Sequence, residues 1–233
     1  MTTKSFIPYS LTHGLLADLS NDEFPTRLRG FDGGWLTLLT AGTHYGYIWE
    51  GGPILMIEAG TFQLAAGMYF SVPGEGKLLG GKGIVITRLG YQGVFSIGGP
   101  VEPTGRLLYI DGCRDSLLIP PVMQGDPCLN ALYFPDGIDQ TPHTHSSVRV
   151  GMIVSGRGEC ITPDETISLK PGQVFVIPAG GLHSFRTTDS PMVVIAYHPT
   201  SETGPTHELH PMRRSTLVNG VSSSQLQEIA TRA

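Results

Sequence analysis

The sequence has few cysteines and lacks the long apolar and basic runs that mark several classes of protein. Its three cysteines include no Cys-x-x-Cys pair, so they predict neither a disulfide framework nor a thiolate zinc site, and we interpret them as buried thiols. No apolar run approaches the ~20 residues of a membrane-spanning helix, and the N-terminal MTTKSFIPYSL has no signal-peptide core. We therefore expect a soluble, cytoplasmic protein with no membrane partner.

Positive charge is scarce as well. The chain has 15 lysines and arginines against 20 aspartates and glutamates, for a net charge of −5. No basic cluster is present that would neutralise a nucleic-acid backbone. Nucleic acid is therefore not an expected partner.

What the chain does contain is a pattern of short strands separated by turns. Hydrophobic residues make up 40% of it, and 31 glycines and 18 prolines are spread along it. Apolar runs such as ILMI, MYFSV, VFVIP and MVVIAY recur at roughly ten-residue spacing, which is typical of an antiparallel sandwich or barrel. Helix is expected only in the tail segment SSSQLQEIATRA and near the start in THGLLADLS.

The chain also contains an internal repeat. Offset by 105 residues, the segment from Gly46 aligns without a gap with the segment from Gly151. The aligned pairs include Gly51 with Gly156, Thr61 with Thr166, Gly67 with Gly172, and Pro73 with Pro178. Shared glycines and prolines indicate shared turns, so we expect two copies of one β unit, at about 25–100 and 125–200, joined by a connecting strand at 106–112.

The second copy holds three histidines that could meet at one point. His143 and His145 are one residue apart, so on an extended strand they face the same side. His183 follows a turn made by Pro178 and two glycines. Three neutral imidazoles on a sheet suit a divalent first-row metal and leave coordination positions open.

The segment from Gly137 to Gly156 resembles the first cupin motif, G(X)5HXH(X)3,4E(X)6G. Gly137, His143, His145 and Gly156 match it in spacing, and Arg149 occupies the glutamate position. The resemblance implies that the two histidines are metal ligands. An arginine cannot ligate a cation, so the site resembles the three-histidine cupin variant.

The segment from Gly172 to Thr187 resembles the second cupin motif, G(X)5PXG(X)2H(X)3N. Gly172, Pro178, Gly180 and His183 match it, and Thr187 replaces the final asparagine. The resemblance implies that His183 is the third ligand. Together with the internal repeat, this resemblance implies a bicupin, which is an all-β protein of two jelly-roll β-barrels. We expect an N-terminal barrel over 1–112, and a metal-binding barrel plus a tail helix over 113–233.

The first copy does not retain the ligand positions. At the same offset they become Leu38, Thr40 and Leu78, and Arg149 becomes His44. We therefore expect no metal site in the N-terminal barrel, and we interpret His44 as a structural histidine. Open β edges make a homodimer the expected assembly.

Several other side chains are candidates for the site. Arg149 would either point inward and clamp a substrate carboxylate, or swing to the rim and pair with an acidic neighbour such as Asp139. Tyr197 and His198 lie on opposite faces of the closing strand, so one of them faces the barrel interior as a candidate catalytic group. Phe185 shares the parity of His183 and is expected to line the pocket.

The cupin fold hosts many activities, so the site has to choose among them. Three histidines without glutamate resemble cupin dioxygenases, which implies an Fe(II) dioxygenase acting on a small organic acid or chelating enolate. A non-oxidative isomerase, cyclase or lyase using Zn(II), Ni(II) or Mn(II) is the second interpretation, and it needs a proton shuttle such as Tyr197 or His198. A non-catalytic cupin that binds a small ligand is the third.

Overall fold

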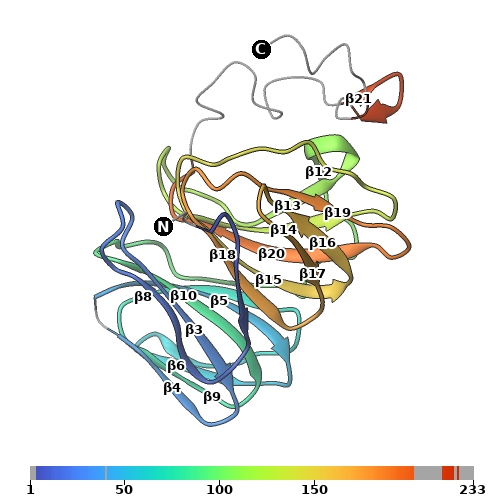
Figure 1. Cartoon of the computed structure of the whole chain (residues 1–233). Coiled ribbons are helices and arrows are strands. Elements are labelled where there is room, and N and C mark those ends of the chain that lie inside the picture. The colour runs from blue at the N-terminus through green and yellow to red at the C-terminus, as the bar shows by residue number, and fades with distance from the viewer. Residues whose placement is uncertain (1–3, 40, 202–216, 223–224, 226–233) are drawn as a thin grey trace.

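The computed structural model describes residues 4–39, 41–201, 217–222 and 225, and it is built almost wholly of β-strands (Figure 1). The named helical element of this part is a single 3-10 turn, η1 (Ile110–Gly112). Among the described residues, no helix is long and apolar enough to span a membrane. The predicted all-β class and the scarcity of helix are confirmed.

The strands of the first half form two antiparallel sheets, which we call the N-terminal sheets. The six-stranded sheet has the order β11-β8-β5-β10-β3-β2, and the four-stranded sheet the order β4-β9-β6-β7. The larger sheet contains β2 (Gly14–Leu19), β3 (Thr26–Asp32), β5 (Gly42–Glu50), β8 (Tyr69–Pro73), β10 (Lys82–Leu89) and β11 (Ser96–Gly98). The smaller contains β4 (Trp35–Leu38), β6 (Ile54–Ile57), β7 (Gly60–Gln63) and β9 (Gly76–Leu79).

The second half forms a corresponding pair, the C-terminal sheets. The seven-stranded sheet has the order β1-β18-β15-β20-β14-β13-β12, and the three-stranded sheet the order β17-β16-β19. The larger contains β1 (Ile7–Ser10), β12 (Leu107–Leu108), β13 (Arg114–Ile119), β14 (Cys128–Phe134), β15 (Arg149–Gly156), β18 (Gln173–Ile177) and β20 (Met192–His198). The smaller contains β16 (Gly158–Ile161), β17 (Thr166–Leu169) and β19 (Ser184–Arg186), and a separate hairpin pairs β21 (Leu217–Val218) with β22 (Val221–Ser222).

The two large sheets share one strand order. The run β8-β5-β10-β3-β2 corresponds to β18-β15-β20-β14-β13, as the internal repeat suggests. The edge partners differ in origin, because β11 pairs with β8 whereas β1, from the start of the chain, pairs with β18. Division of the chain after Gly112 stays a prediction, and β1 and β12 are two strands from the first stretch that lie in the C-terminal sheet.

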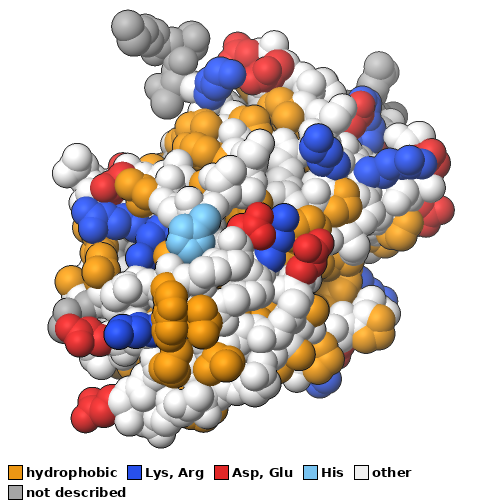
Figure 2. Space-filling view, turned by 90° about the horizontal axis from the view of Figure 1, so that it is seen from below, with side chains coloured by type: hydrophobic (Ala, Val, Ile, Leu, Met, Phe, Trp, Pro, Cys, Tyr) orange, Lys and Arg blue, Asp and Glu red, His pale blue; other side chains and the backbone are white. Residues whose placement is uncertain are grey.

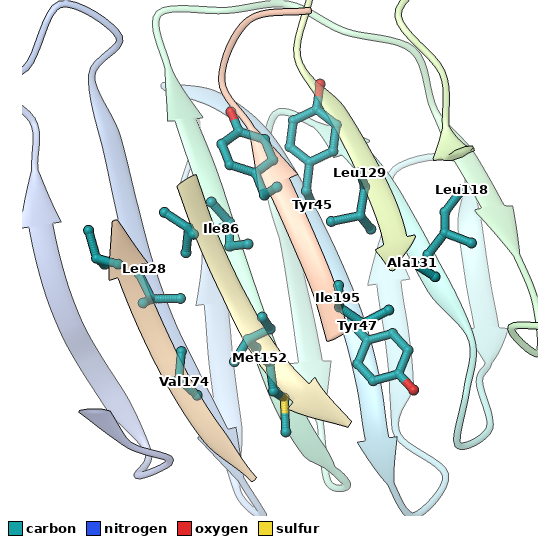
Figure 3. Close-up of a cluster of buried hydrophobic side chains, with 14 of the residues drawn as sticks. Leu28, Tyr45, Tyr47, Ile86, Leu118, Leu129, Ala131, Met152, Val174 and Ile195 are labelled. Carbon is teal, nitrogen blue, oxygen red and sulfur yellow. The ribbon is translucent and has the colours of Figure 1, made fainter. Parts of the chain in front are cut away.

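The largest hydrophobic cluster lies between the two large sheets (Figure 3). Leu28, Tyr45 and Ile86 contribute from the N-terminal sheet, and Met152 and Ile195 from the C-terminal one. Because each large sheet also packs against its smaller partner, strands β5 and β14 are buried along nearly their whole length. Two-sided burial explains why these strands show little alternation of apolar and polar residues.

The helix predicted near the start is wrong, because that segment forms β2, whose backbone pairs with β3. Tertiary pairing overrides the weak helical preference of its leucines and alanine. The predicted tail helix over 222–233 falls almost wholly outside the described residues.

All three cysteines are buried and free, as predicted, and burial raises their thiol pKa values to about 12.

The surface carries charges of both signs. Figure 2 shows lysines and arginines interspersed with aspartates and glutamates over the face seen from below, with hydrophobic side chains in small groups between them.

Candidate metal centre

Two loops of the second half are joined by backbone hydrogen bonds, and the three histidines lie on them. The N–H of His143 donates to the carbonyl of His183 at 2.9 Å, and the N–H of His183 donates back to His143 at 3.1 Å. The N–H of Gly180 also donates to the carbonyl of His145, at 2.7 Å. These backbone hydrogen bonds therefore fix the relative positions of the Cα atoms of the three histidines.

The imidazole rings converge, and the orientation of two of them is set by hydrogen bonds. Possible ligand atoms of His143, His145 and His183 lie within 4.8 Å of one another. The Nδ1 atoms of His143 and His183 are each 2.9 Å from a backbone carbonyl, that of Thr141 and that of Gly181 respectively. Because a carbonyl only accepts, each Nδ1 carries the proton and Nε2 keeps its lone pair for an ion.

Burial favours the neutral form of two of these rings, those of His183 and His145. It lowers the pKa of His183 to about 3, with a smaller contribution from His143. Burial, and next the charge of Arg149, lower the pKa of His145 well below its ordinary value. Metal ligation requires the neutral imidazole, and a donor set of three histidines fits a divalent transition ion.

The three histidines form part of the wall of a small cavity, which we call the histidine cavity. Its lining residues are Tyr109, Leu132, Phe134, His143, His145, Arg149, Phe175, Ile177, His183, Phe185, Val194, Ala196 and His198. The volume open to a sphere of water's size is about 20 Å³, which is room for roughly one water molecule. A larger ligand therefore needs a lining side chain to change rotamer, and it would touch most of the wall.

Arg149 takes the inward orientation of the two considered above. Its side chain lines the cavity and the residue is only 7% exposed. Nη1 donates to the Ser147 hydroxyl at 2.6 Å and to the carbonyls of Ser147 and Val148, both at 3.1 Å. These bonds hold a positive charge at the edge of the three imidazoles.

The remaining candidates divide between the cavity and the core. Phe185 lines the cavity as expected, with its ring centroid 5.6 Å from that of His183. His198 also lines it, 6.3 Å from His145 between ring centroids. Tyr197 points the other way, into the cluster between the large sheets, where its ring lies 5.1 Å from that of Tyr45. Tyr197 is therefore corrected from a candidate catalytic group to a core residue.

Sequence reasoning missed two residues on the segment that connects the halves. Tyr109 lines the cavity. Asp111, which is 3% exposed, accepts a hydrogen bond from the N–H of Thr141, two residues before His143. The Asp-Gly pair at this position signals a turn, but nothing local indicates that the turn reaches the histidine loop.

The equivalent positions of the first half are part of its core. Leu38 and Leu78 are each 1% exposed, and Thr40 lies outside the described residues. His44 is fully buried, and its Nε2–H donates to the carbonyl of Leu39 while Nδ1 accepts from the Thr87 hydroxyl, both at 2.8 Å. His44 is thus a structural histidine, as predicted.

Comparison with known proteins supports this picture. Residues 132–198 match the cupin domain model, and no curated protein sequence matches the chain. Several solved structures share the fold. A cupin 2 conserved barrel domain protein from Leptotrichia buccalis has a TM-score of 0.57 at 15% identity, over 84% of this chain and 90% of its own. Protein Ylba from E. coli has a TM-score of 0.59 at 17% identity, over 84% of both chains.

A salicylate 1,2-dioxygenase from Pseudaminobacter salicylatoxidans has a TM-score of 0.60 at 12% identity, over 80% of this chain and 76% of its own. At such identities these likenesses show the fold alone. The motif residues and the domain match identify residues 132–198 as a cupin domain, and the described chain shares its fold with these solved structures.

Proposed function

We propose that the protein is an Fe(II)-dependent dioxygenase that acts on a small organic acid. The observation that carries this proposal is the donor set: three converging imidazoles, those of His143 and His183 buried and that of His145 half-buried, with an inward arginine in place of a carboxylate ligand. Neutral ligands leave the full positive charge on a divalent ion, which favours an anionic, chelating substrate. The fold shared with a salicylate 1,2-dioxygenase supports the same direction.

The chain's own residues account for binding and orientation. His143, His145 and His183 would hold the iron, which when bound supplies oxygen activation and a site for substrate oxygen atoms. Arg149 presents a planar guanidinium beside them, suited to a substrate carboxylate. Apolar side chains such as Phe185 and Ile177 exclude water and restrict the substrate to a small one.

The test begins with the metal. Protein purified without chelators or a metal-affinity tag is analysed for bound elements, then loaded with Fe(II) in the absence of air. Oxygen uptake is measured with a panel of hydroxy, keto and thiol acids that includes glycolate and salicylate. Iron near one equivalent per chain and uptake dependent on one acid support the proposal. Bound iron with no uptake on any acid contradicts it.

A second function is supported by His198. His198 lines the cavity, and its imidazole is neutral there because burial, followed by the charge of Arg149, lowers its pKa well below the ordinary value. Such a ring is a weak base that can take part in proton transfer to and from a substrate. This is the shuttle that a Zn(II), Ni(II) or Mn(II) isomerase, cyclase or lyase would need. Turnover of an acid without oxygen uptake, abolished by His198→Gln, would identify this alternative.

A further inference from the structure

Tyr109 reaches the histidine cavity from the segment that joins the two halves. Its backbone N–H donates to the carbonyl of Cys113 at 2.9 Å, which closes the turn around η1. Its side chain lines the cavity and packs against the hydrophobic cluster that contains Phe134 and Phe185. The turn thus places the side chain of Tyr109 beside residues that come from β14 and β19.

The same turn is tied to the metal-ligand loop. Asp111, within η1, accepts the hydrogen bond from the N–H of Thr141, and the carbonyl of Thr141 accepts one from Nδ1 of His143. Two hydrogen bonds through Thr141 thus connect the Asp111 side chain, two residues from Tyr109, to the imidazole of His143. A tyrosine held in this way is preorganised to contact a ligand at the histidines.

The hydroxyl group of Tyr109 has a distinct role among the lining residues. Among the described residues that line the cavity, Tyr109 alone carries a hydroxyl group, and the other polar ones are four histidines and Arg149. Burial raises the pKa of Tyr109 above its ordinary value, against a smaller lowering effect from Arg149. The side chain is then a neutral phenol, which can donate a hydrogen bond at neutral pH.

We propose that Tyr109 is a specificity-determining residue, which donates a hydrogen bond to the second oxygen of a chelating acid while Arg149 holds the carboxylate. This inference rests on the proposed function, because it assumes that an acid binds beside the three histidines. It narrows the substrate class to acids with a hydroxyl or keto oxygen next to the carboxylate. Tyr109 and Arg149 line the same small cavity, so both border the space that such a ligand would occupy.

The test compares two small acids that differ by one hydroxyl group. Glycolate and acetate are titrated into the Co(II)-loaded full chain, and binding is followed by the visible absorption of the metal. We expect Tyr109→Phe to weaken glycolate binding about five- to tenfold, the value of one hydrogen bond, and to leave the acetate dissociation constant within about twofold. Tyr9→Phe, outside the cavity, serves as the matched control.

The outcomes separate the two proposals. Cobalt content and thermal midpoint are measured for each variant, since phenylalanine preserves the packing of the ring. If wild-type protein binds neither acid, the proposed function fails and this inference fails with it. If wild-type protein binds glycolate and consumes oxygen with a hydroxy acid, but Tyr109→Phe changes neither dissociation constant or weakens both acids equally, only the inference is overturned.

Discussion

The backbones of His143 and His183 exchange two hydrogen bonds, at 2.9 and 3.1 Å, although the residues lie on separate loops. These bonds involve no side-chain atoms, so the loops should keep their arrangement when an imidazole is removed. We expect His183→Ala to lose nearly all bound metal while its far-ultraviolet circular dichroism matches that of wild type. The exposed His13 provides a control, because His13→Ala should retain its metal. A His183→Ala protein with full metal content would contradict the assignment of the ligands.

Asp111 provides a second prediction, because its carboxylate supports the loop that carries His143. The residue has a φ of 56°, a conformation that glycine and asparagine also adopt. Groups that orient a ligand typically change metal affinity by about 10- to 100-fold. Asp111→Gly should therefore weaken zinc or cobalt binding by about tenfold, whereas Asp111→Asn, which keeps an acceptor oxygen, should remain close to wild type. Competition with a chromophoric chelator measures both, and equal affinities in the two variants would argue against the support role.

Arg149 yields a prediction about anion binding. Arg149→Met keeps an unbranched chain and removes the positive charge, so acetate and glycolate should both bind the Co(II)-loaded protein at least about tenfold more weakly, as expected for a charged hydrogen bond of 1.5–3 kcal/mol. Metal content should not fall. Arg157→Met, at an exposed ion pair with Asp189, is the control. Unchanged acetate binding in Arg149→Met would rule out the carboxylate clamp.

Asp115 predicts a pH dependence of stability. Burial raises its pKa to about 6, and a hydrogen bond from Asn130 at 2.7 Å offsets this only in part. The folded chain then binds a proton more tightly than the unfolded chain, so the free energy of unfolding contributed by this group falls as pH rises from about 4 to about 6. Asp115→Asn removes that loss and should stabilise the protein at pH 7 by about 1–2 kcal/mol.

Urea unfolding at pH 4.5 and pH 7 measures the effect of Asp115→Asn. The stabilisation should be present at pH 7 and small at pH 4.5. The exposed Asp164 supplies the control variant Asp164→Asn, which should change little at either pH. A difference between wild type and Asp115→Asn that does not vary with pH would show that the carboxylate is not protonated in this range.

His44 predicts the opposite trend. Burial lowers its pKa to about 4, so the folded chain favours the neutral ring. Its contribution is complete above the ordinary pKa near 6.5 and is lost as pH falls towards 4. His44→Ala removes two buried hydrogen bonds and leaves a cavity, which should cost about 2–4 kcal/mol at pH 7.5. The cost should shrink at pH 5, and metal content should stay at the wild-type level. A loss of metal would instead link the first half to the site.

Much of the candidate site was predictable from the sequence because it depends on local spacing. The one-residue spacing of His143 and His145 and the turn at Pro178–Gly181 were sufficient to group them with His183, although the structure places them on loops and not on an extended strand. The spacing of the two motifs was sufficient to indicate the family. The glycines and prolines shared by the two copies likewise predicted a repeated β unit, and the two large sheets do share one strand order.

Other features depended on contacts between distant segments. The helix expected near the start is β2, because the edge of β3 offers it backbone partners. Tyr109 and Asp111 were not identified, since no local pattern shows that the connecting turn reaches the loop of His143. Both cases involve hydrogen bonds or packing that form only when the chain has folded.

Tyr197 and His198 show what strand geometry predicts and what only the packing of the sheets decides. Strand geometry alone requires them to face opposite sides of β20. Which side is the cavity is decided by the packing of the two large sheets, because that packing buries the Tyr197 face against Tyr45 and leaves His198 beside the three histidines. The sequence by itself determined most of the strands and turns and the grouping of the three histidines, and the tertiary structure decided which side chains surround them, because those contacts form only between distant segments.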